Sequence, residues 1–265
     1  MTVLDIEKFA KLAHDHKVPL IVDNTFATPI LCRPIDFGAD IVIHSTSKYL
    51  DGHAVALGGA VVDGGTFDWA ASGKFPEFTV PDDSYHGVVY TEKFGKAAFI
   101  VKARAQLMRD LGPAPAPQNA FLLNLGMETL HLRMPCHSSN ALKVAEFLEN
   151  DDRVAWVNYP GLASSKYKPL VDKYLPKGAS GVVSFGVKGG REAAGKLLDS
   201  LELAAIVTHV ADARTCALHP ASTTHRQMTD EQLREGGVSP DLIRLSVGIE
   251  NVDDIIADLD NALGK

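Results

Sequence analysis

Two short apolar runs near the amino terminus constrain the fold of this chain more than any other feature. Residues 19–25 read PLIVDNT and residues 39–45 read ADIVIHS, with a connector at 29–38 between them. Continuous apolar runs separated by crossovers are typical of strands in a parallel sheet that is buried on both faces. The stretch LGGAVVDGG (57–65) predicts a third strand, and its glycines indicate close approach of the backbone to its neighbours. We therefore expect an α/β fold that begins with this sheet.

The segments around these strands predict helices and one long loop. Residues 3–16 have apolar side chains at helical spacing, which predicts an amphipathic helix. Residues 64–90 are rich in Gly, Pro, Asp and Ser and carry scattered aromatic residues, so we expect a long loop there. Such loops in compact domains are usually functional or disordered. Helical patterning returns over residues 92–111.

The stretch GPAPAPQN (112–119) is the best candidate for a domain boundary, because its prolines end the preceding helix and stiffen a linker. It predicts a larger domain over residues 1–117 and a small α+β or α/β domain over residues 118–265. The second domain is expected to begin with two helices, or one broken helix, and then to alternate strands with helices. The expected helices are NAFLLNLGMETLHLRM, SSNALKVAEFLEND, EAAGKLLDSL and VDDIIADLDNAL, and the expected strands are VAWVNY, GVVSFGV and LIRLSVGI.

The composition excludes several classes of function. The net charge of −7 argues against nucleic acid as a partner, because phosphate binding requires a basic surface. No apolar run approaches the ~18 residues that a membrane-spanning helix requires. The clusters of Lys and Arg are short and interrupted by acids, which is unlike a membrane-binding surface. We therefore expect neither nucleic acid nor a membrane as a partner.

The cysteines and the amino-terminal segment predict a cytoplasmic location. Cys32, Cys136 and Cys216 are widely spaced and odd in number, which is typical of buried thiols in a reducing compartment. The first residues include Asp5 and Glu7 and lack the basic region before an apolar core that marks a signal peptide.

Candidate reactive residues follow the first two predicted strands at their carboxyl ends. Asp23 follows LIV, and Ser45, Ser47 and Lys48 follow DIVIH. In open α/β sheets this is the edge at which ligands bind. A lysine amine that forms a Schiff base with an aldehyde cofactor needs an aromatic electron sink, and a carboxylate keeps the nitrogen of a pyridine ring protonated. Serine hydroxyls just before the lysine would contact a cofactor phosphate.

This spacing fits pyridoxal 5'-phosphate (PLP). On the pattern alone an alternative stays open, in which Lys48 is a solvated lysine and Asp23 merely ends a strand, because S-x-S-K is a common tetrapeptide. His53, which follows the lysine closely, either lines the same pocket or is a structural residue.

A metal site is not expected. Cys216, His219 and His225 are spaced loosely like metal ligands, and His14 and His16 form an H-x-H pair. The cluster lacks a second cysteine or a carboxylate at regular spacing. Packing or surface histidines are therefore the favoured interpretation.

Longer stretches of the sequence carry a resemblance to a known family. They include VDNTFATP, ADIVIHSTSKYLDGH and LGGAVV, and they continue through QNAFLLNLGMETLHLRM, YPGLAS, HPASTTH and IRLSVGIE. In these stretches the chain resembles the Cys/Met-metabolism family of PLP-dependent enzymes over essentially its whole length. The resemblance implies a type I PLP-dependent transferase fold of the aspartate-aminotransferase kind, with part of the large domain in residues 1–117 and the small domain in residues 118–265.

The resemblance also implies roles for individual residues. Lys48 matches the Schiff-base lysine, and Asp23 matches the carboxylate partner of the pyridine nitrogen. Ser45 and Ser47 match the hydroxyl ligands of the cofactor phosphate, although the family more often has threonine at the second position. Arg244 matches the arginine that binds the substrate α-carboxylate, a role that suits its bidentate fork. Without the resemblance, a structural ion pair at a strand end would be preferred for Arg244.

The long segment 64–90 and the form HPASTTH resemble the branch of the family that sulfhydrylates O-acetylhomoserine. The implied reaction is γ-replacement on O-acetyl-L-homoserine by sulfide or a thiol, which gives homocysteine or a methionine-type product and acetate. Cystathionine γ-synthase, cystathionine γ-lyase and methionine γ-lyase share the same residues and remain alternatives. An alternative of another class is a non-catalytic fragment that associates with an intact homologue.

Members of this family are longer than this chain, which resembles them from a point inside the cofactor domain. The resemblance implies that an upstream part would supply a Gly-rich phosphate turn and an aromatic residue that stacks on the cofactor ring. We expect a chain without that part to leave apolar sheet and helix faces uncovered and to be nearly inactive by itself. The resemblance also implies a small-molecule amino-acid substrate and a homo-oligomer, which is a tetramer in intact members.

Overall fold

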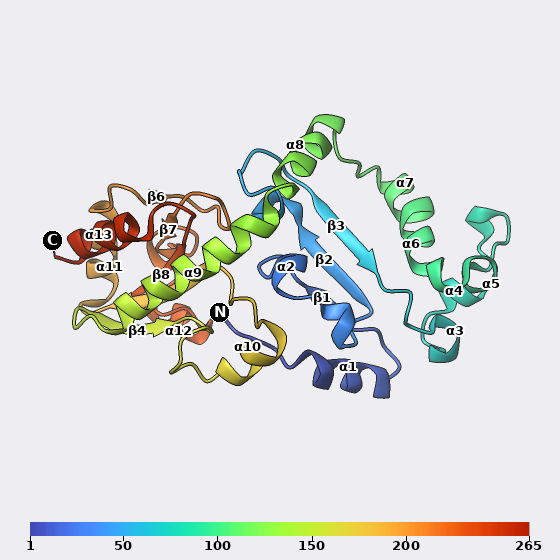
Figure 1. Ribbon diagram of the computed structural model, residues 1–265. Coiled ribbons are helices and arrows are strands. Elements are labelled where there is room, and N and C mark those ends of the chain that lie inside the picture. Colours follow the sequence, from blue (N-terminus) through green and yellow to red (C-terminus); the bar gives the residue numbers. More distant parts are fainter. Residues whose placement is uncertain (265) are drawn as a thin grey trace.

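The computed structural model describes residues 1–264 and contains two sheets joined by a long helix (Figure 1). The first sheet has the strand order β1-β2-β3, and the second has the order β4-β5-β8-β7-β6. The strands are β1 (Ile21–Asp23), β2 (Ile41–Ser45), β3 (Gly59–Asp63), β4 (Val154–Asn158), β5 (Val182–Val187), β6 (Ala205–Ile206), β7 (Cys216–Leu218) and β8 (Leu242–Ser246).

Helices alternate with the strands along the chain, so the fold class is α/β. Among residues 1–264, no helix combines the length and the apolar character that crossing a bilayer requires. The α-helices are α1 (Ile6–Asp15), α2 (Thr28–Leu31), α3 (Trp69–Ser72), α4 (Pro76–Thr79), α5 (Tyr90–Phe94), α6 (Ala98–Lys102), α7 (Arg109–Leu111), α8 (Pro117–Met127), α9 (Leu130–Glu149), α10 (Lys168–Tyr174), α11 (Gly190–Asp199), α12 (Asp230–Glu235) and α13 (Val252–Leu263). The 3-10 helical turns are η1 (Pro34–Phe37), η3 (Asp83–Tyr85), η4 (Gly95–Ala97) and η6 (Pro220–Ser222), and the π-helical turns are η2 (Thr46–Leu50) and η5 (Ala103–Met108).

The amino-terminal sheet is only partly parallel, which corrects the expectation of a parallel sheet. β1 pairs with β2 in parallel, with Asp23 opposite Ile43. β3 pairs with β2 in the antiparallel direction, with Ser45 opposite Gly59. The direction follows from the connection, because the chain folds back directly after η2 and does not place a crossover helix on the sheet face, as a parallel connection requires.

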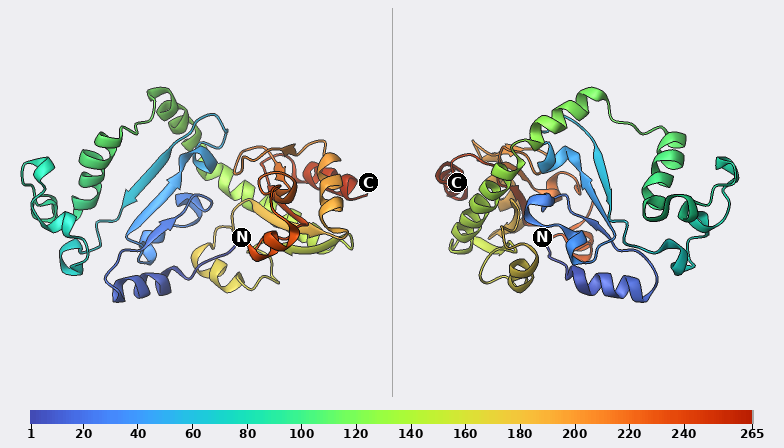
Figure 2. Two further views of the ribbon diagram at one scale, coloured as in Figure 1. Left: turned by 180° about the vertical axis from the view of Figure 1, so that it is seen from behind. Right: turned by 45° about the vertical axis from the view of Figure 1, so that its right-hand side comes forward.

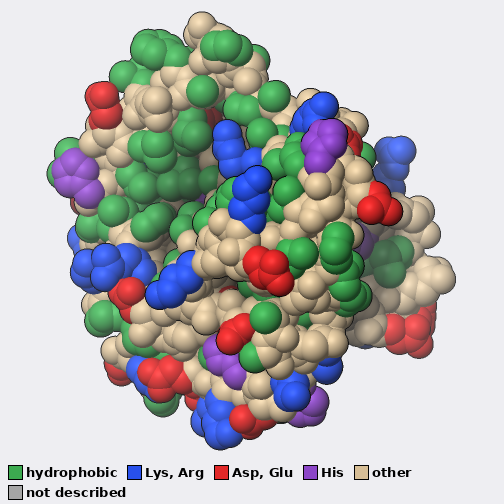
Figure 3. Space-filling model, turned by 90° about the vertical axis from the view of Figure 1, so that its right-hand side faces the viewer, with side chains coloured by type: hydrophobic (Ala, Val, Ile, Leu, Met, Phe, Trp, Pro, Cys, Tyr) green, Lys and Arg blue, Asp and Glu red, His purple; other side chains and the backbone are tan. Residues whose placement is uncertain are grey.

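This sheet is also less buried than its apolar sequence predicts. Ile41 and Val42 on the central strand are buried, but Ile21 on β1 is 52% exposed and Val61 on β3 is 49% exposed. Figure 3 shows hydrophobic side chains gathered in a hollow on the side of the molecule that lies at the right of Figure 1. The described residues therefore leave apolar faces uncovered, as expected.

Residues 64–90 do not form the long loop that their composition predicts. They contain α3, α4 and η3, which form an arm with α5, α6 and α7 beyond β3 (Figure 2). The Trp69 ring stacks on Phe99 at a centroid distance of 5.5 Å and lies 4.4 Å from Phe78. The buried side chain of Ile41 belongs to the same cluster. Aromatic packing of this kind supplies the core of the arm.

The expected boundary coincides with a change of direction in the chain. α7 ends at Gly112, which has a left-handed φ of 76°, and α8 begins at Pro117. The division at residues 117/118 into two domains stays a prediction. The two helices expected beyond it are present, but the expected break between them at residues 135–137 is wrong. The chain breaks at residues 128–129, and α9 continues through Pro135.

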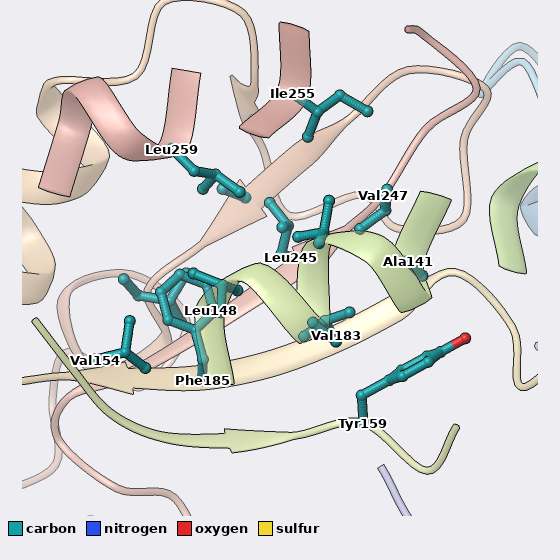
Figure 4. Close-up of a cluster of buried hydrophobic side chains, with 14 of the residues drawn as sticks. Ala141, Leu148, Val154, Tyr159, Val183, Phe185, Leu245, Val247, Ile255 and Leu259 are labelled. Atoms are coloured by element: carbon teal, nitrogen blue, oxygen red, sulfur yellow. The ribbon is translucent and has the colours of Figure 1, made fainter. Parts of the chain in front are cut away.

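The carboxyl-terminal sheet carries the larger core (Figure 4). β5 pairs in the antiparallel direction with β4 and β8, and β8 with β7, whereas β6 runs parallel to β7. The three expected strands correspond to β4, β5 and β8, while β6 and β7 were not predicted. Side chains of α9, α11 and α13 pack on this sheet and include Leu148, Leu197, Ile255 and Leu259.

His137 ties α9 to the chain directly after β8. The ring is fully buried, and its Nδ1 lies 2.8 Å from the carbonyl oxygen of Val247. Burial lowers the pKa of His137 to about 4. The folded protein therefore keeps this ring neutral at a pH at which an unfolded histidine already binds a proton.

We expect the free energy of unfolding to fall as the pH drops from about 6.5 to about 4, by ~3 kcal/mol for His137 alone. The sign follows because the unfolded chain binds the proton first. Urea unfolding of the wild type and of His137→Gln across this range measures the effect, and the variant should show a flatter dependence on pH. Parallel curves for the two proteins would contradict the prediction.

Candidate active site

Lys48 lies directly beyond the carboxyl end of β2, in the π-helical turn η2. Its backbone (φ −102°, ψ −139°) interrupts the helical path of that turn. Two hydrogen bonds place the start of the turn: Ser45 N donates to Thr25 Oγ1 at 2.8 Å, and Thr46 N donates to Gly58 O at 3.0 Å. The reversal after β2 therefore holds Lys48 at the edge where α/β sheets bind ligands.

A cavity of about 390 Å³ joins Lys48 to the end of β1. Asp23, Ser45 and Lys48, three of the five predicted site residues, line it together. The remaining wall comes from the amino terminus, the segment after β1 and the carboxyl-terminal half of the chain: Met1, Thr2, Val3, Asn24, Thr25, Phe26, Ala27, Pro160, Leu175, Ala179 and Ser180.

The surroundings of Lys48 favour a neutral amine. Burial lowers the pKa of Lys48, the positive charge of Arg244 lowers it further, and Cys216 acts in the opposite direction. Loss of the proton leaves a lone pair on Nζ, so the amine becomes a nucleophile and a proton acceptor closer to neutral pH.

Arg244 projects from β8, far from Lys48 in the sequence but close enough to affect its pKa. Its Nη2 donates to Thr208 O at 2.9 Å and to His209 O at 3.0 Å. Its Nε is buried and has no partner among the described residues. Burial also lowers the pKa of Arg244. The guanidinium is therefore oriented by two carbonyls and retains unused donors for an anionic group.

Asp23 ends β1 with its carboxylate toward the cavity. Its Oδ1 accepts a hydrogen bond from Thr25 N at 2.9 Å, which fixes the side chain in a turn. Burial lowers the pKa of the neighbouring His44, and the negative charge of Asp23 opposes that shift. The carboxylate therefore lies near enough to His44 to act on its charge.

Ser47 has a different environment from Ser45. It is buried outside the lining of the cavity, and its Oγ accepts from Gly58 N at 3.0 Å. Its hydroxyl hydrogen is directed only at a weak contact, 3.4 Å from Gly58 O. The structure therefore brings Asp23, Ser45 and Lys48 together, places Arg244 within electrostatic reach, and engages Ser47 with the loop before β3.

The sequence analysis did not identify two residues of the site. Thr25 orders the turn after β2 through its hydroxyl, and its position two residues beyond Asp23 at a strand end was an available signal. Ser180 lines the cavity from the other half of the chain, with a positive φ of 72° and a buried side chain that interacts with Tyr49. Nothing local in the sequence around Ser180 indicates this.

Cys216 and His219 are engaged in packing, whereas His225 is partly exposed and its Nδ1 lies 2.9 Å from Thr224 Oγ1. Cys216 is buried on β7, and the His219 ring lies 3.0 Å from Ser222 Oγ and 2.8 Å from Pro240 O. Within residues 1–264, no group of three or more His, Cys, Asp or Glu side chains is placed to hold a metal ion.

The donor set of the cavity fits PLP. It offers an amine of lowered basicity, a carboxylate at a strand end, and the hydroxyl of Ser45. The unpartnered Arg244 Nε is a buried polar atom that would otherwise lack a hydrogen bond among the described residues. An anionic oxygen of a bound amino acid would satisfy it.

Comparison with known proteins agrees with this chemistry. A profile of the family described as "Cys/Met metabolism PLP-dependent enzyme" matches residues 1–264. The O-acetyl-L-homoserine sulfhydrylase of Leptospira meyeri is 49% identical over 272 residues, which cover 99% of this chain and 61% of that protein. The homocysteine synthase of Schizosaccharomyces pombe is 49% identical over 263 residues, with 98% and 61% covered. The chain thus spans about 61% of the length of these relatives.

A solved structure from Campylobacter jejuni, described as an O-acetylhomoserine (thiol)-lyase, superimposes with a TM-score of 0.93 at 41% sequence identity. The match covers 100% of this chain and 63% of the other. That protein carries N'-pyridoxyl-lysine-5'-monophosphate, a lysine joined to the cofactor.

Proposed function

The chain belongs to the Cys/Met metabolism PLP-dependent enzyme family, and from this premise we propose that it acts in γ-replacement on O-acetyl-L-homoserine, with Lys48 as the lysine that holds PLP. The acceptor is sulfide or a thiol, and the products are homocysteine or a methionine-type thioether and acetate. One observation carries the proposal: the depressed basicity of Lys48 in a cavity that it shares with Asp23 and Ser45.

Four side chains would hold the cofactor. Lys48 supplies the covalent link, Asp23 pairs with the pyridine nitrogen, and the hydroxyls of Ser45 and Ser47 contact the phosphate. Ser47 lies outside the lining of the cavity and accepts from Gly58 N, so of the two hydroxyls only that of Ser45 meets the cavity directly. When bound, PLP supplies an electron sink that stabilises negative charge at the carbon next to the amino group.

The protein's own groups then orient the substrate and move its protons. Arg244 binds the α-carboxylate through the donors that Thr208 and His209 leave unused. With the carboxylate held by Arg244, Lys48 Nζ, whose pKa burial lowers, would accept the Cα proton and return a proton at the neighbouring carbons. Acetate leaves from Cγ, and the sulfur nucleophile adds there.

The lyases and synthases of the same family would use every residue named above, so the products decide between them. We expect the chain, supplied with PLP, O-acetyl-L-homoserine and sulfide, to give almost no product alone and to give homocysteine and acetate after mixing with a separately made upstream part of a relative, measured by mass spectrometry. Cystathionine formed preferentially from cysteine in that mixture would indicate a cystathionine γ-synthase. Ammonia and a 2-oxo acid from methionine or cystathionine would indicate a γ-lyase. No product even in the mixture, with PLP bound, would favour the non-catalytic alternative.

We also propose that the protein is a homo-oligomer and that it works in the cytoplasm on a small amino-acid substrate. The uncovered apolar side chains of the first sheet, such as Ile21 and Val61, support association, because soluble proteins rarely leave large apolar patches exposed. The cysteines within residues 1–264 are free thiols, which supports a reducing compartment.

A further inference from the structure

A buried arginine lies directly behind the reactive turn. Arg133, near the start of α9, is 5% exposed and forms no ion pair among the described residues. Burial lowers the pKa of its guanidinium, and the charge of Asp51 opposes the shift. A buried charge without a partner is strongly destabilising, so its hydrogen bonds must compensate.

Two of those hydrogen bonds reach the backbone after Lys48, while Nε donates to Thr129 Oγ1 at 3.1 Å beside its own helix. Arg133 Nη1 donates to Tyr49 O at 2.8 Å, and Nη2 lies 3.4 Å from Leu50 O. Nη2 also donates to Gly126 O at 2.7 Å. The chain leaves the helical path soon afterwards, so the carbonyls of Tyr49 and Leu50 have no backbone N–H donors from a following turn of helix. The N–H groups of the Arg133 guanidinium replace those donors.

Two glycines make room for the contact. A Cβ on Gly52, whose φ is 74°, would lie 2.3 Å from Arg133 Nη1. A Cβ on Gly126 would lie 2.2 Å from Asp51 O, so the end of α8 and the reactive turn meet backbone to backbone. Side chains at either position would separate α8 and α9 from the turn.

The same turn is joined to the segments around Arg244. Gly52 O accepts from Ala213 N at 2.8 Å, and Ala213 O accepts from Ile249 N at 2.8 Å, just beyond β8. A shift of the turn would therefore change the placement of Lys48 relative to the carboxylate-binding arginine.

We propose that Arg133 is a positioning residue that clamps the backbone on the carboxyl side of Lys48 and so directs the Lys48 amine into the cavity with Asp23 and Ser45. The inference rests on the proposed function only in taking Lys48 as the reactive amine. Without the hydrogen bonds from Arg133 the irregular turn relaxes, and the Lys48 side chain becomes more exposed to solvent.

Trace acetylation followed by mass spectrometry tests this, because it measures the reactivity of every lysine against pH without any cofactor. In Arg133→Met we expect the apparent pKa of Lys48, taken from its acetylation rate against pH, to rise by about one unit. Its acetylation near pH 7.5 should then be about tenfold slower. Arg133→Lys, which keeps the charge and one donor, should recover part of the change. The exposed Lys143 on α9 should be unaffected in both variants.

Arg153→Met is the matched control. Arg153 pairs with Asp151 and Asp260 at the surface, so its loss removes ion pairs and leaves the reactive turn intact. In this variant the dependence of Lys48 acetylation on pH should equal that of the wild type. An unchanged Lys48 profile in folded Arg133→Met would overturn the proposal, as would an equal shift in Arg153→Met.

If circular dichroism shows that Arg133→Met does not fold, Gly52→Ala decides, because its new Cβ displaces the guanidinium. Folded Gly52→Ala with a wild-type dependence of Lys48 acetylation on pH would also overturn the proposal. Borohydride reduction of the wild type with PLP separates the proposed function from the positioning role of Arg133. Absence of an adduct at Lys48 contradicts the proposed function, while the acetylation profiles still decide the role of Arg133.

Discussion

Lys48→Ala should abolish covalent capture of PLP by the chain while leaving the fold intact. Lys48 is the lysine among the residues that line the cavity at the ends of β1 and β2. Burial and the charge of Arg244 lower its pKa, so its amine competes best for an aldehyde near neutral pH. The measurement is incubation with PLP, reduction with borohydride and mass spectrometry of the peptides, with circular dichroism to confirm the fold.

Lys143→Ala serves as the control, because that side chain is exposed on α9 away from the cavity. It should capture PLP at residue 48 as the wild type does. If Lys48→Ala still took up one equivalent of PLP on another lysine with the affinity of the wild type, the assignment of Lys48 would be wrong.

Replacing Arg244 by methionine should weaken binding of the amino-acid substrate by about 30-fold to several thousand-fold, since losing one partner of a buried charge pair costs roughly 2–5 kcal/mol. The Thr208 and His209 carbonyls hold the guanidinium with its remaining donors free for a carboxylate. Arg244→Lys should recover little, because an ammonium lacks the bidentate fork. Titration of the PLP-loaded chain with O-acetyl-L-homoserine, followed by absorbance, gives the dissociation constants.

The control for this prediction is a ligand without a carboxylate, such as 3-aminopropyl acetate. Wild type and Arg244→Met should bind it equally, whereas an equal loss with both ligands would show that Arg244 is structural. Arg244→Met should also raise the pKa of Lys48, because it removes a positive charge that lowers it. Trace acetylation of Lys48 against pH detects that shift independently of substrate.

Much of the amino-terminal site could be predicted because its signals are local. The runs before Asp23 and Ser45 are apolar and short, and they became β1 and β2 with their carboxyl ends at one edge. The composition of residues 64–90 misled the prediction, because the pairing of Trp69 with Phe99 is a contact between residues far apart in the chain. The antiparallel direction of β3 was not predicted either, because it follows from the reversal of the chain after η2.

The sequence by itself determined the class of fold, the strand ends that carry Asp23, Ser45 and Lys48, and the family resemblance that identified Arg244. Only the tertiary structure decided that Arg244 lies within electrostatic reach of Lys48, that Ser180 closes the cavity, and that Arg133 reaches the carbonyls behind the reactive turn. The physical reason is separation along the chain. Strand and turn preferences act over a few neighbouring residues, whereas these contacts join residues more than 80 positions apart and exist only once both sheets have packed against α9.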